Sequence, residues 1–226
     1  MFNEIGARLQ ALVGELEPIR QTAGRLVDQT AKVDPSIGTL LISHRPAIGT
    51  EAYAIVLYPG ISEELIAGYE NIHSARLPAK FEIPGEYRAF LRILNGADVY
   101  QMSLYGLPVS MSKIPPLLNR SVRQPLDLAT ANINWKNRYR PNESQFHFGS
   151  GPYSDNENIA YFLNPDKSVE ARRVGGEVFT TWTSVRDFLT QEILRVETLF
   201  PSYESSRKEL LQMLEMRERA KKPRKK

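Results

Sequence analysis

A regular apolar stripe runs through the first thirty residues of the chain. Its members recur at alternating spacings of four and three, which places them on one face of a helix. They are Ile5, Leu9, Leu12, Leu16, Ile19, Ala23 and Leu26. Pro18 interrupts the pattern and predicts a kink or a break there. The stripe predicts an amphipathic helix docked on its own domain. A seam between two copies is the alternative, because coiled coils use the same spacing.

The segment Lys32–Gly38 is expected to end the first helix, and two β-like runs follow it. The first is Thr39–Ser43. The second, Ala52–Tyr58, is apolar on both faces, which is typical of a central strand covered on each side. Ser62 then suits the N-cap of a helix, and the acidic residues after it suit the first turn. The buried stripe expected for this helix is Leu65, Ile66, Tyr69 and Ile72.

A second helix is predicted after Ile83-Pro84, because proline suits the first turn of a helix. Its core-facing residues fall at i, i+3, i+4 and i+7, and they are Tyr87, Phe90, Leu91 and Leu94. Asn95-Gly96 is expected to end this helix, with Gly96 in the left-handed conformation. Val99–Tyr105 is interpreted as one strand that is closed by Gly106-Leu107-Pro108.

The second half of the chain is predicted to be mainly β. A short helix at Asp127–Asn137 precedes four strand-like runs, two of which form a hairpin around the turn Asn164–Lys167. The runs are Gln145–Phe148, Asn158–Leu163, Ser168–Arg173 and Val178–Trp182. Ser184 then caps a helix that ends at Pro201, and Ser202 starts a last helix that leads into a lysine-rich tail. The inward residues of the first of these helices are Val185, Phe188, Leu189, Ile193 and Val196.

Three of these segments, in this order, resemble the SUKH superfamily. They are IPGEYRAFLRILNG (Ile83–Gly96), FHFGSGPYSDNENIAYFL (Phe146–Leu163) and VFTTWTSVRDFL (Val178–Leu189). The resemblance implies an α+β fold with a mixed, largely antiparallel sheet flanked by helices. Bacterial members are immunity proteins that neutralise toxins, often nucleases, and a fungal relative regulates cell-wall assembly. The shared motif residues have structural roles, so the resemblance carries over no catalytic residue.

The resemblance covers about residues 55–198 and leaves both ends of the chain outside it. We therefore expect three parts: an N-terminal amphipathic helix and linker over 1–37, a SUKH-like α+β domain over 38–200, and a C-terminal helix with a basic tail over 201–226. An N-terminal helix and a C-terminal helical extension thus flank the domain. An apolar content of 42% and a charged content of 24% are ordinary for a globular protein.

The positive net charge of the chain belongs to its tail. The last ten residues hold seven of the 29 Lys and Arg residues and one of the 26 Asp and Glu residues, so residues 1–216 carry a net charge of −3. The tail, which ends in KKPRKK, suits a solubilising segment or non-specific contact with nucleic acid or another acidic surface. No stretch approaches the about 20 apolar residues that span a bilayer. There is no cysteine and no secretory signal, so we expect a cytoplasmic protein.

The chain offers little catalytic chemistry. Its three histidines form no HxH or HExxH pattern, and Gly149-Ser150-Gly151 lacks the lysine of a phosphate-binding loop. His147 lies between Phe146 and Phe148 on a predicted strand and so points opposite to them. It is interpreted as a surface or hydrogen-bonded histidine. We therefore expect no enzyme, no catalytic residue, no metal and no cofactor.

Five residues are candidates for contact with a protein partner. Trp135, Tyr139 and Tyr153 lie in polar stretches, and large aromatic side chains are favoured at interfaces. Asp155 and Glu157 belong to an oxygen-rich cluster that lacks the spacing of an EF-hand calcium loop, and they could contact a basic partner. The alternatives are aromatic side chains that pack under loops and a solvated turn.

Two hypotheses of function remain open. The first is an immunity protein that occludes the active site of a toxin domain. The mildly acidic body of the chain supports it, because complementary charge speeds association with basic nucleases. The second is a regulatory or scaffold protein that acts through its N-terminal helix and basic tail. Monomer and homodimer both remain open.

Overall fold

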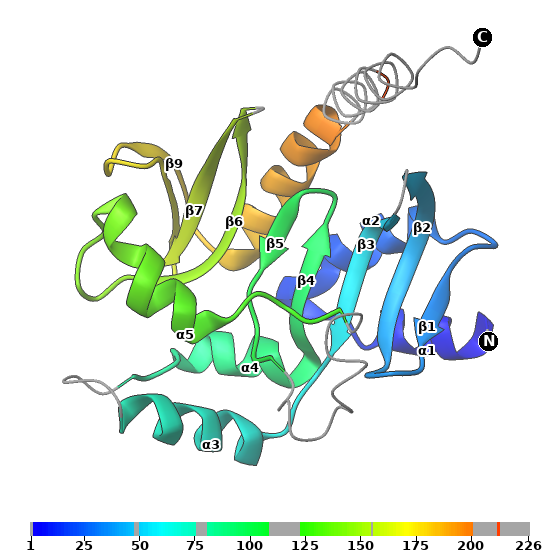
Figure 1. Ribbon diagram of the computed structural model, residues 1–226, viewed down its shortest axis with the longest axis horizontal. Helices are drawn as coiled ribbons and strands as arrows, with labels where there is room; N and C mark the ends of the chain where they lie inside the picture. The colour runs from blue at the N-terminus through cyan, green and yellow to red at the C-terminus, as the bar shows by residue number, and fades with distance from the viewer. Residues whose placement is uncertain are drawn as a thin grey trace, which may run out of the picture.

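A nine-stranded antiparallel sheet forms the centre of the molecule, and its strands lie side by side in chain order (Figure 1). The computed structural model describes residues 2–47, 50–75, 81–108, 123–154, 156–200 and 212. The strands are β1 (Lys32–Asp34), β2 (Thr39–Ala47), β3 (Thr50–Pro59), β4 (Leu94–Val99), β5 (Met102–Leu104), β6 (Phe146–Ser154), β7 (Glu157–Leu163), β8 (Val169–Arg172) and β9 (Val178–Trp182). Neighbouring strands in this sheet pair antiparallel, and a parallel bridge joins Gly106 to Asp127 outside it.

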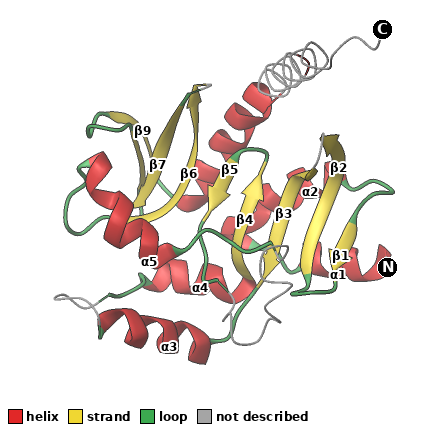
Figure 2. Cartoon of the chain, viewed as in Figure 1, coloured by secondary structure: helices red, strands yellow, loops and turns green. Residues whose placement is uncertain are grey.

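Helices cover both faces of the sheet. They are α1 (Phe2–Gln10), α2 (Glu17–Leu26), α3 (Glu63–Ser74), α4 (Gly85–Ile93), α5 (Leu128–Thr130) and a C-terminal helix over 185–200. Shorter helical turns are η1 (Gly14–Leu16), η3 (Ala131–Trp135) and η4 (Lys136–Tyr139), the last two continuing α5. In Figures 1 and 2, α1, α2 and the C-terminal helix lie behind the sheet and α5 lies in front of it. The expected α+β fold, with helices at both ends of the domain, is confirmed.

The N-terminal stripe is buried in the main core. Ile5, Leu9, Leu12, Leu16, Ile19 and Ala23 are at most 8% exposed, and Leu26 packs against the same cluster. The stripe therefore docks on its own domain and leaves no apolar seam for a second copy. The helix is broken as expected, but the break falls at residues 11–13, before Pro18. Pro18 lies in the first turn of α2, where its missing N–H costs no helical hydrogen bond.

The expected central strand is confirmed as β3, which is covered on both faces. Ile55 and Leu57 belong to the main core, whereas Val56 and Tyr58 pack in a smaller cluster with Leu41 and Tyr53. Side chains alternate between the faces of a strand, so the apolar run fills both. The expected hairpin over Asn158–Arg173 is confirmed as β7 and β8, and the Ser184 hydroxyl accepts from the Asp187 N–H at 3.1 Å to cap the C-terminal helix.

Three expectations about local structure are wrong. Val99–Tyr105 is a hairpin, because Tyr100 has a φ of +54° and turns β4 back into β5. Asn95-Gly96 does not end the helix: α4 ends at Ile93 with Leu94 as its C-cap, and both residues belong to β4, although Gly96 has the expected positive φ of +87°. Part of the stretch taken as a linker is the edge strand β1, which pairs with β2 through its backbone.

The helix α3 does not bury the stripe expected of it. Ser62 caps it as expected by accepting from the Leu65 N–H, but of the four predicted residues only Ile66 is buried. Leu65 and Ile72 are 54% and 55% exposed. α3 lies at one edge of the fold and is held there by a few contacts, such as the Tyr69 hydroxyl, which accepts from the Ala129 N–H at 2.7 Å. The expectation fails because the helix touches the core along a narrow line.

The motif residues at 87 and 95 join separate strands and loops. The Tyr87 hydroxyl donates to the carbonyls of Tyr105 and Phe148, at 2.5 and 3.2 Å, and so ties the end of β5 to β6. The buried Asn95 amide donates to the Leu107 carbonyl and accepts from the Leu107 N–H, both at 2.8 Å. These contacts give the motif a structural role.

Candidate functional site

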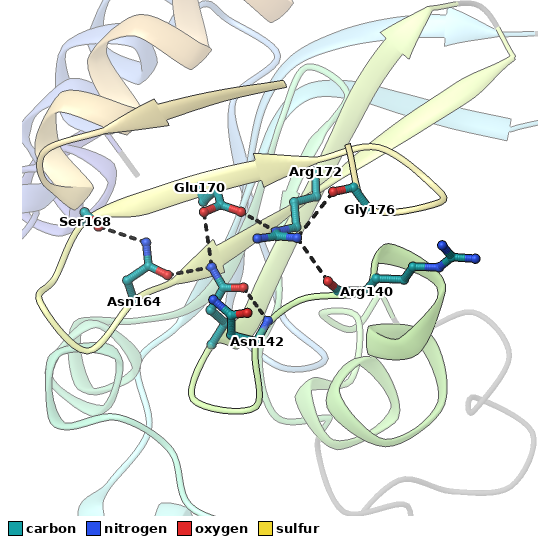
Figure 3. Close-up of polar contacts among 8 residues, drawn as sticks. Arg140, Asn142, Asn164, Ser168, Glu170, Arg172 and Gly176 are labelled. Atoms are coloured by element: carbon teal, nitrogen blue, oxygen red, sulfur yellow. Dashed lines mark hydrogen bonds and ion pairs between the residues drawn. The ribbon is translucent and has the colours of Figure 1, made fainter. Parts of the chain in front are cut away.

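A polar network on the front face of the sheet is structural. Gln145 is 3% exposed, and its Nε2 donates to Asn164 Oδ1 at 2.7 Å and to Glu170 Oε2 at 3.3 Å, while its Oε1 accepts from the Asn142 N–H at 2.8 Å (Figure 3). Arg172 pairs with Glu170 and donates to two loop carbonyls. The polar groups of this network hydrogen-bond to one another and hold the loop before β6 in place. Few of these groups are therefore left to bind a ligand.

Trp135 and Tyr139 pack on this front face and are half-buried. The Trp135 ring meets the edge of Tyr105 at 6.0 Å between centroids, and the Tyr139 ring meets His147 at 5.6 Å and Phe162 at 6.2 Å. Burial raises the pKa of the Tyr139 hydroxyl. Both rings therefore cover the sheet under the α5–η4 segment, which is the packing role given above as the alternative to an interface role.

His147 is buried among these rings and is hydrogen-bonded, as one of the two sequence interpretations expected. Its Nδ1 lies 3.3 Å from the Ala131 carbonyl and its Nε2 lies 3.1 Å from the Gly149 carbonyl. Burial lowers its pKa to about 4, although the two carbonyls act in the opposite direction. The surface interpretation is wrong, because the side chain is 1% exposed.

Tyr153 and Glu157 come together at the far end of the β6–β7 hairpin. Glu157 accepts from both the Nε and an Nη of Arg173, each at 2.9 Å, and the Arg173 guanidinium lies over the Tyr153 ring at 4.3 Å. The hydrogen bonds from Arg173 lower the pKa of Glu157, and they raise the pKa of Arg173. Glu157 is therefore a partnered carboxylate that orients Arg173. Asp155, the other acidic candidate, lies outside the described residues.

A second arginine extends this stack toward the core. The Arg195 guanidinium lies 5.5 Å from the centroid of the Phe179 ring, which meets Tyr153 edge-on at 5.3 Å. Arg195 also pairs with the fully buried Glu192, which accepts from the Tyr161 hydroxyl. A Cβ at Gly151 would lie 1.9 Å from that hydroxyl, so glycine is required there. Tyr153 and Phe179 thus rest between two arginines whose positions are set by carboxylates.

Exposed apolar side chains adjoin the stack on the β8–β9 hairpin. Phe179 is 38% exposed, Val178 is 46% exposed and Val174 is 59% exposed. We call Tyr153, Arg173, Val174, Val178 and Phe179 the β8–β9 patch. It combines exposed apolar area with a pre-oriented arginine, and both are features of protein-binding surfaces.

A polar pocket of about 480 Å³ lies beside this patch, between the tips of two hairpins. β5 pairs with β6 only at Ser103–Ser150 and Leu104–Gly149, so the β4–β5 and β6–β7 hairpins diverge beyond residue 150 (Figure 1). We call the space between their ends the tip pocket. Its lining is Gln101, Pro152, Ser154, Asn156, Glu157, Asn158 and Leu199.

The polar side chains of the tip pocket differ from those of the front network. Within the described part of the chain, the side chains of Gln101, Ser154, Asn156 and Asn158 have no hydrogen-bond partner, and Gln101 Nε2 is shielded from solvent as well. Buried polar atoms in folded proteins are nearly always paired, and an exception calls for a functional explanation. The tip pocket and the β8–β9 patch together form the candidate site.

The described polar side chains of the tip pocket are suited to hydrogen bonding. In the described lining of the tip pocket, the Glu157 carboxylate is held by Arg173, and the other polar side chains are amides and a hydroxyl that do not titrate near neutral pH. Among the described residues, there is no cluster of three or more His, Asp or Glu side chains that would hold a metal ion.

Sequence reasoning found two members of the site and missed the others. Tyr153 and Glu157 were predicted, but Arg173 and Phe179 were assigned only to strands. The predicted hairpin contained the missing signal: its turn at Asn164–Lys167 places Arg173 diagonally across from Glu157, and opposite charges on neighbouring strands attract. Gln101 carried no such signal, because its turn was taken for the middle of a strand.

Comparison of the chain with protein-family models, with curated protein sequences and with solved structures finds no match. Across the described segments, no helix combines the length and the apolar character needed to cross a membrane.

Proposed function

We propose that this protein binds another protein through the β8–β9 patch, and that the partner is a toxin domain whose active site it covers. The observation that carries the first half of the proposal is the stacking of Arg173 and Phe179 on Tyr153. Arginine and tyrosine are enriched among the residues that dominate interface energies. The ion pair with Glu157 restricts the Arg173 side chain before binding, which reduces the entropy lost on association.

The second half of the proposal rests on the resemblance of the three motifs to immunity proteins. It also fits the burial of motif residues such as Tyr87 and Asn95, because a motif that builds the scaffold leaves the surface loops free to vary from one partner to another. Regulation through the apolar face of the N-terminal helices is not favoured, since that face lies in the main core.

The test is co-expression with toxin domains encoded beside this gene. The proposal predicts restored growth and a stable purified complex for one of them. Arg173→Ala and Phe179→Ala should each weaken binding at least tenfold, or about 1.4 kcal/mol. Ile72→Ala, at an exposed apolar position on α3, and Arg138→Ala, at an exposed arginine on η4, are the controls and should change the Kd less than threefold.

Two results would count against the proposal. If no neighbouring toxin domain is neutralised or bound, the immunity role fails. If a domain is bound but the patch variants and the control variants weaken binding equally, the toxin partner stands and the assignment of the surface is wrong.

A further inference from the structure

We infer that the tip pocket binds a neutral amide-bearing segment of a protein, such as a loop that presents main-chain amides or an Asn or Gln side chain. The inference rests on the proposed function only in taking a protein as the source of the ligand. Its physical basis is the shielded and unpartnered Nε2 of Gln101, which lies beside three exposed polar side chains that have no partner among the described residues: Ser154, Asn156 and Asn158.

The lining determines the chemistry of the ligand. Three carboxamides and one hydroxyl offer both donors and acceptors, which matches the amide group, itself a donor and an acceptor. The charged group in the lining, Glu157, is already compensated by two hydrogen bonds from Arg173. Among the described lining residues, a charged ligand would meet no uncompensated opposite charge, and burying an uncompensated charge is unfavourable. The described lining therefore favours a neutral ligand over a cation or an anion.

The geometry excludes recognition by strand addition along β6. Pro152 has no N–H, and its carbonyl accepts from Arg195 at 2.6 Å. At this point the main chain of β6 therefore has neither a free N–H nor a free carbonyl for pairing with an incoming strand. Proline is common on exposed edge strands, where it prevents such pairing. The side chains of the lining therefore contact the ligand, and Leu199 of the C-terminal helix forms the apolar wall of the pocket.

A volume of about 480 Å³ lies within the range of small-ligand sites. Saccharides also bind through amides and hydroxyls, but they usually stack on an aromatic ring. The described lining contains none, since Tyr153 and Phe179 belong to the neighbouring patch. The lining therefore favours a peptide over a sugar.

The first test compares the stability of single variants of the full chain. Gln101→Leu should leave the Tm unchanged or raise it, because its Nε2 has no partner to lose among the described residues. Gln145→Leu, the matched control in the front network, should lower the Tm, because it removes three hydrogen bonds. A loss of stability in Gln101→Leu as large as in Gln145→Leu would overturn the inference and make Gln101 a structural residue.

The second test is a titration followed by NMR of the side-chain amides of Gln101, Asn156 and Asn158. The probe is the blocked peptide N-acetyl-Gly-Asn-Gly-amide, with its Asp and Lys counterparts and trehalose as comparisons. The neutral peptide should give saturable shifts, and the charged peptides should bind at least tenfold more weakly. Gln101→Leu should abolish the shifts at Asn156 and Asn158, whereas Asn71→Leu on α3 should preserve them.

Equal binding of charged and neutral peptides, saturable binding of trehalose alone, or no saturable shift with any probe would each overturn the inference. None of these results depends on a toxin partner. The proposal for the tip pocket can therefore be refuted while the proposal for the β8–β9 patch is supported, and the reverse also holds.

Discussion

The buried His147 makes a prediction about acid stability that can be worked out from its surroundings. Its ring is 1% exposed, stacks on Phe162 at 4.8 Å between centroids, and lies between two backbone carbonyls. Burial outweighs those carbonyls and lowers the pKa from 6.5 to about 4. The folded protein therefore binds a proton at this site less readily than the unfolded chain does.

The sign and the size of the effect follow from proton linkage. Above pH 6.5 the imidazole is neutral in both states and has no effect on the pH dependence of stability. Below pH 6.5 the unfolded chain takes up a proton that the folded protein refuses, so the free energy of unfolding falls until about pH 4. The loss from this one group is about 2 kcal/mol at pH 5 and about 3 kcal/mol at pH 4.

Urea denaturation of the wild type and of His147→Phe at several pH values between 7 and 4 measures this loss. The variant keeps a ring against Phe162 but does not titrate. It is less stable at pH 7, because one of the two carbonyls, that of Ala131 or that of Gly149, loses the single N–H that the neutral imidazole donates. The difference between the two proteins should then shrink by about 3 kcal/mol as the pH falls to 4, since only the wild type loses this contribution. A constant difference across the range, or an NMR titration of His147 with a midpoint at or above 6.5, would refute the reasoning.

Three further predictions concern residues that hold strands together, and each is checked by urea denaturation. Tyr87→Phe should lower the free energy of unfolding by about 1 kcal/mol, since two carbonyls lose a shared donor, and an unchanged stability would contradict that role. Asn95→Ala should cost about 2–3 kcal/mol, because it leaves the buried N–H and carbonyl of Leu107 unpaired. Gly151→Ala should cost about 1–3 kcal/mol through overlap with the Tyr161 hydroxyl, and adding Tyr161→Phe should recover part of the loss if the overlap is the cause.

The elements that could be predicted from sequence are those specified by local patterns. The strands β3, β7 and β8 and the C-terminal helix each have a clear apolar period with turn or cap residues beside it, and the structure confirms them. The turn at Tyr100 was missed because a large aromatic residue is unusual at positive φ, and because the apolar residues Val99 and Met102 on either side of the turn favour a continuous strand. Its conformation is held from a distance, by the bond from the Tyr100 N–H to the Ala54 carbonyl at 2.6 Å.

The tip pocket could not be predicted for a related reason. Gln101, Asn158 and Leu199 are far apart in the chain and meet because the sheet opens between β5 and β6. The register there depends on two residue pairs, Ser103–Ser150 and Leu104–Gly149. No local sequence pattern indicates either pair. The β8–β9 patch could be predicted in part from the sequence. The β7–β8 hairpin was predicted, but the stacking of Arg173 and Phe179 on Tyr153 was not.

The order of the strands in the sheet has a consequence for how the chain folds as it is synthesised. Because each strand from β2 onward pairs with the strand before it in the chain, the sheet can form from β1 onward during translation. The core that it shares with α1 and α2 needs the last helix. Arg25 and Glu197, which are 172 residues apart, meet at 3.2 Å, and Phe188, Ile193 and Val196 fill the same apolar cluster as Ile19 and Ala23. A nascent chain that stalls before residue 185 therefore presents a sheet whose apolar face is covered by α1 and α2 but not by the C-terminal helix. We expect such a chain to bind chaperones or aggregate.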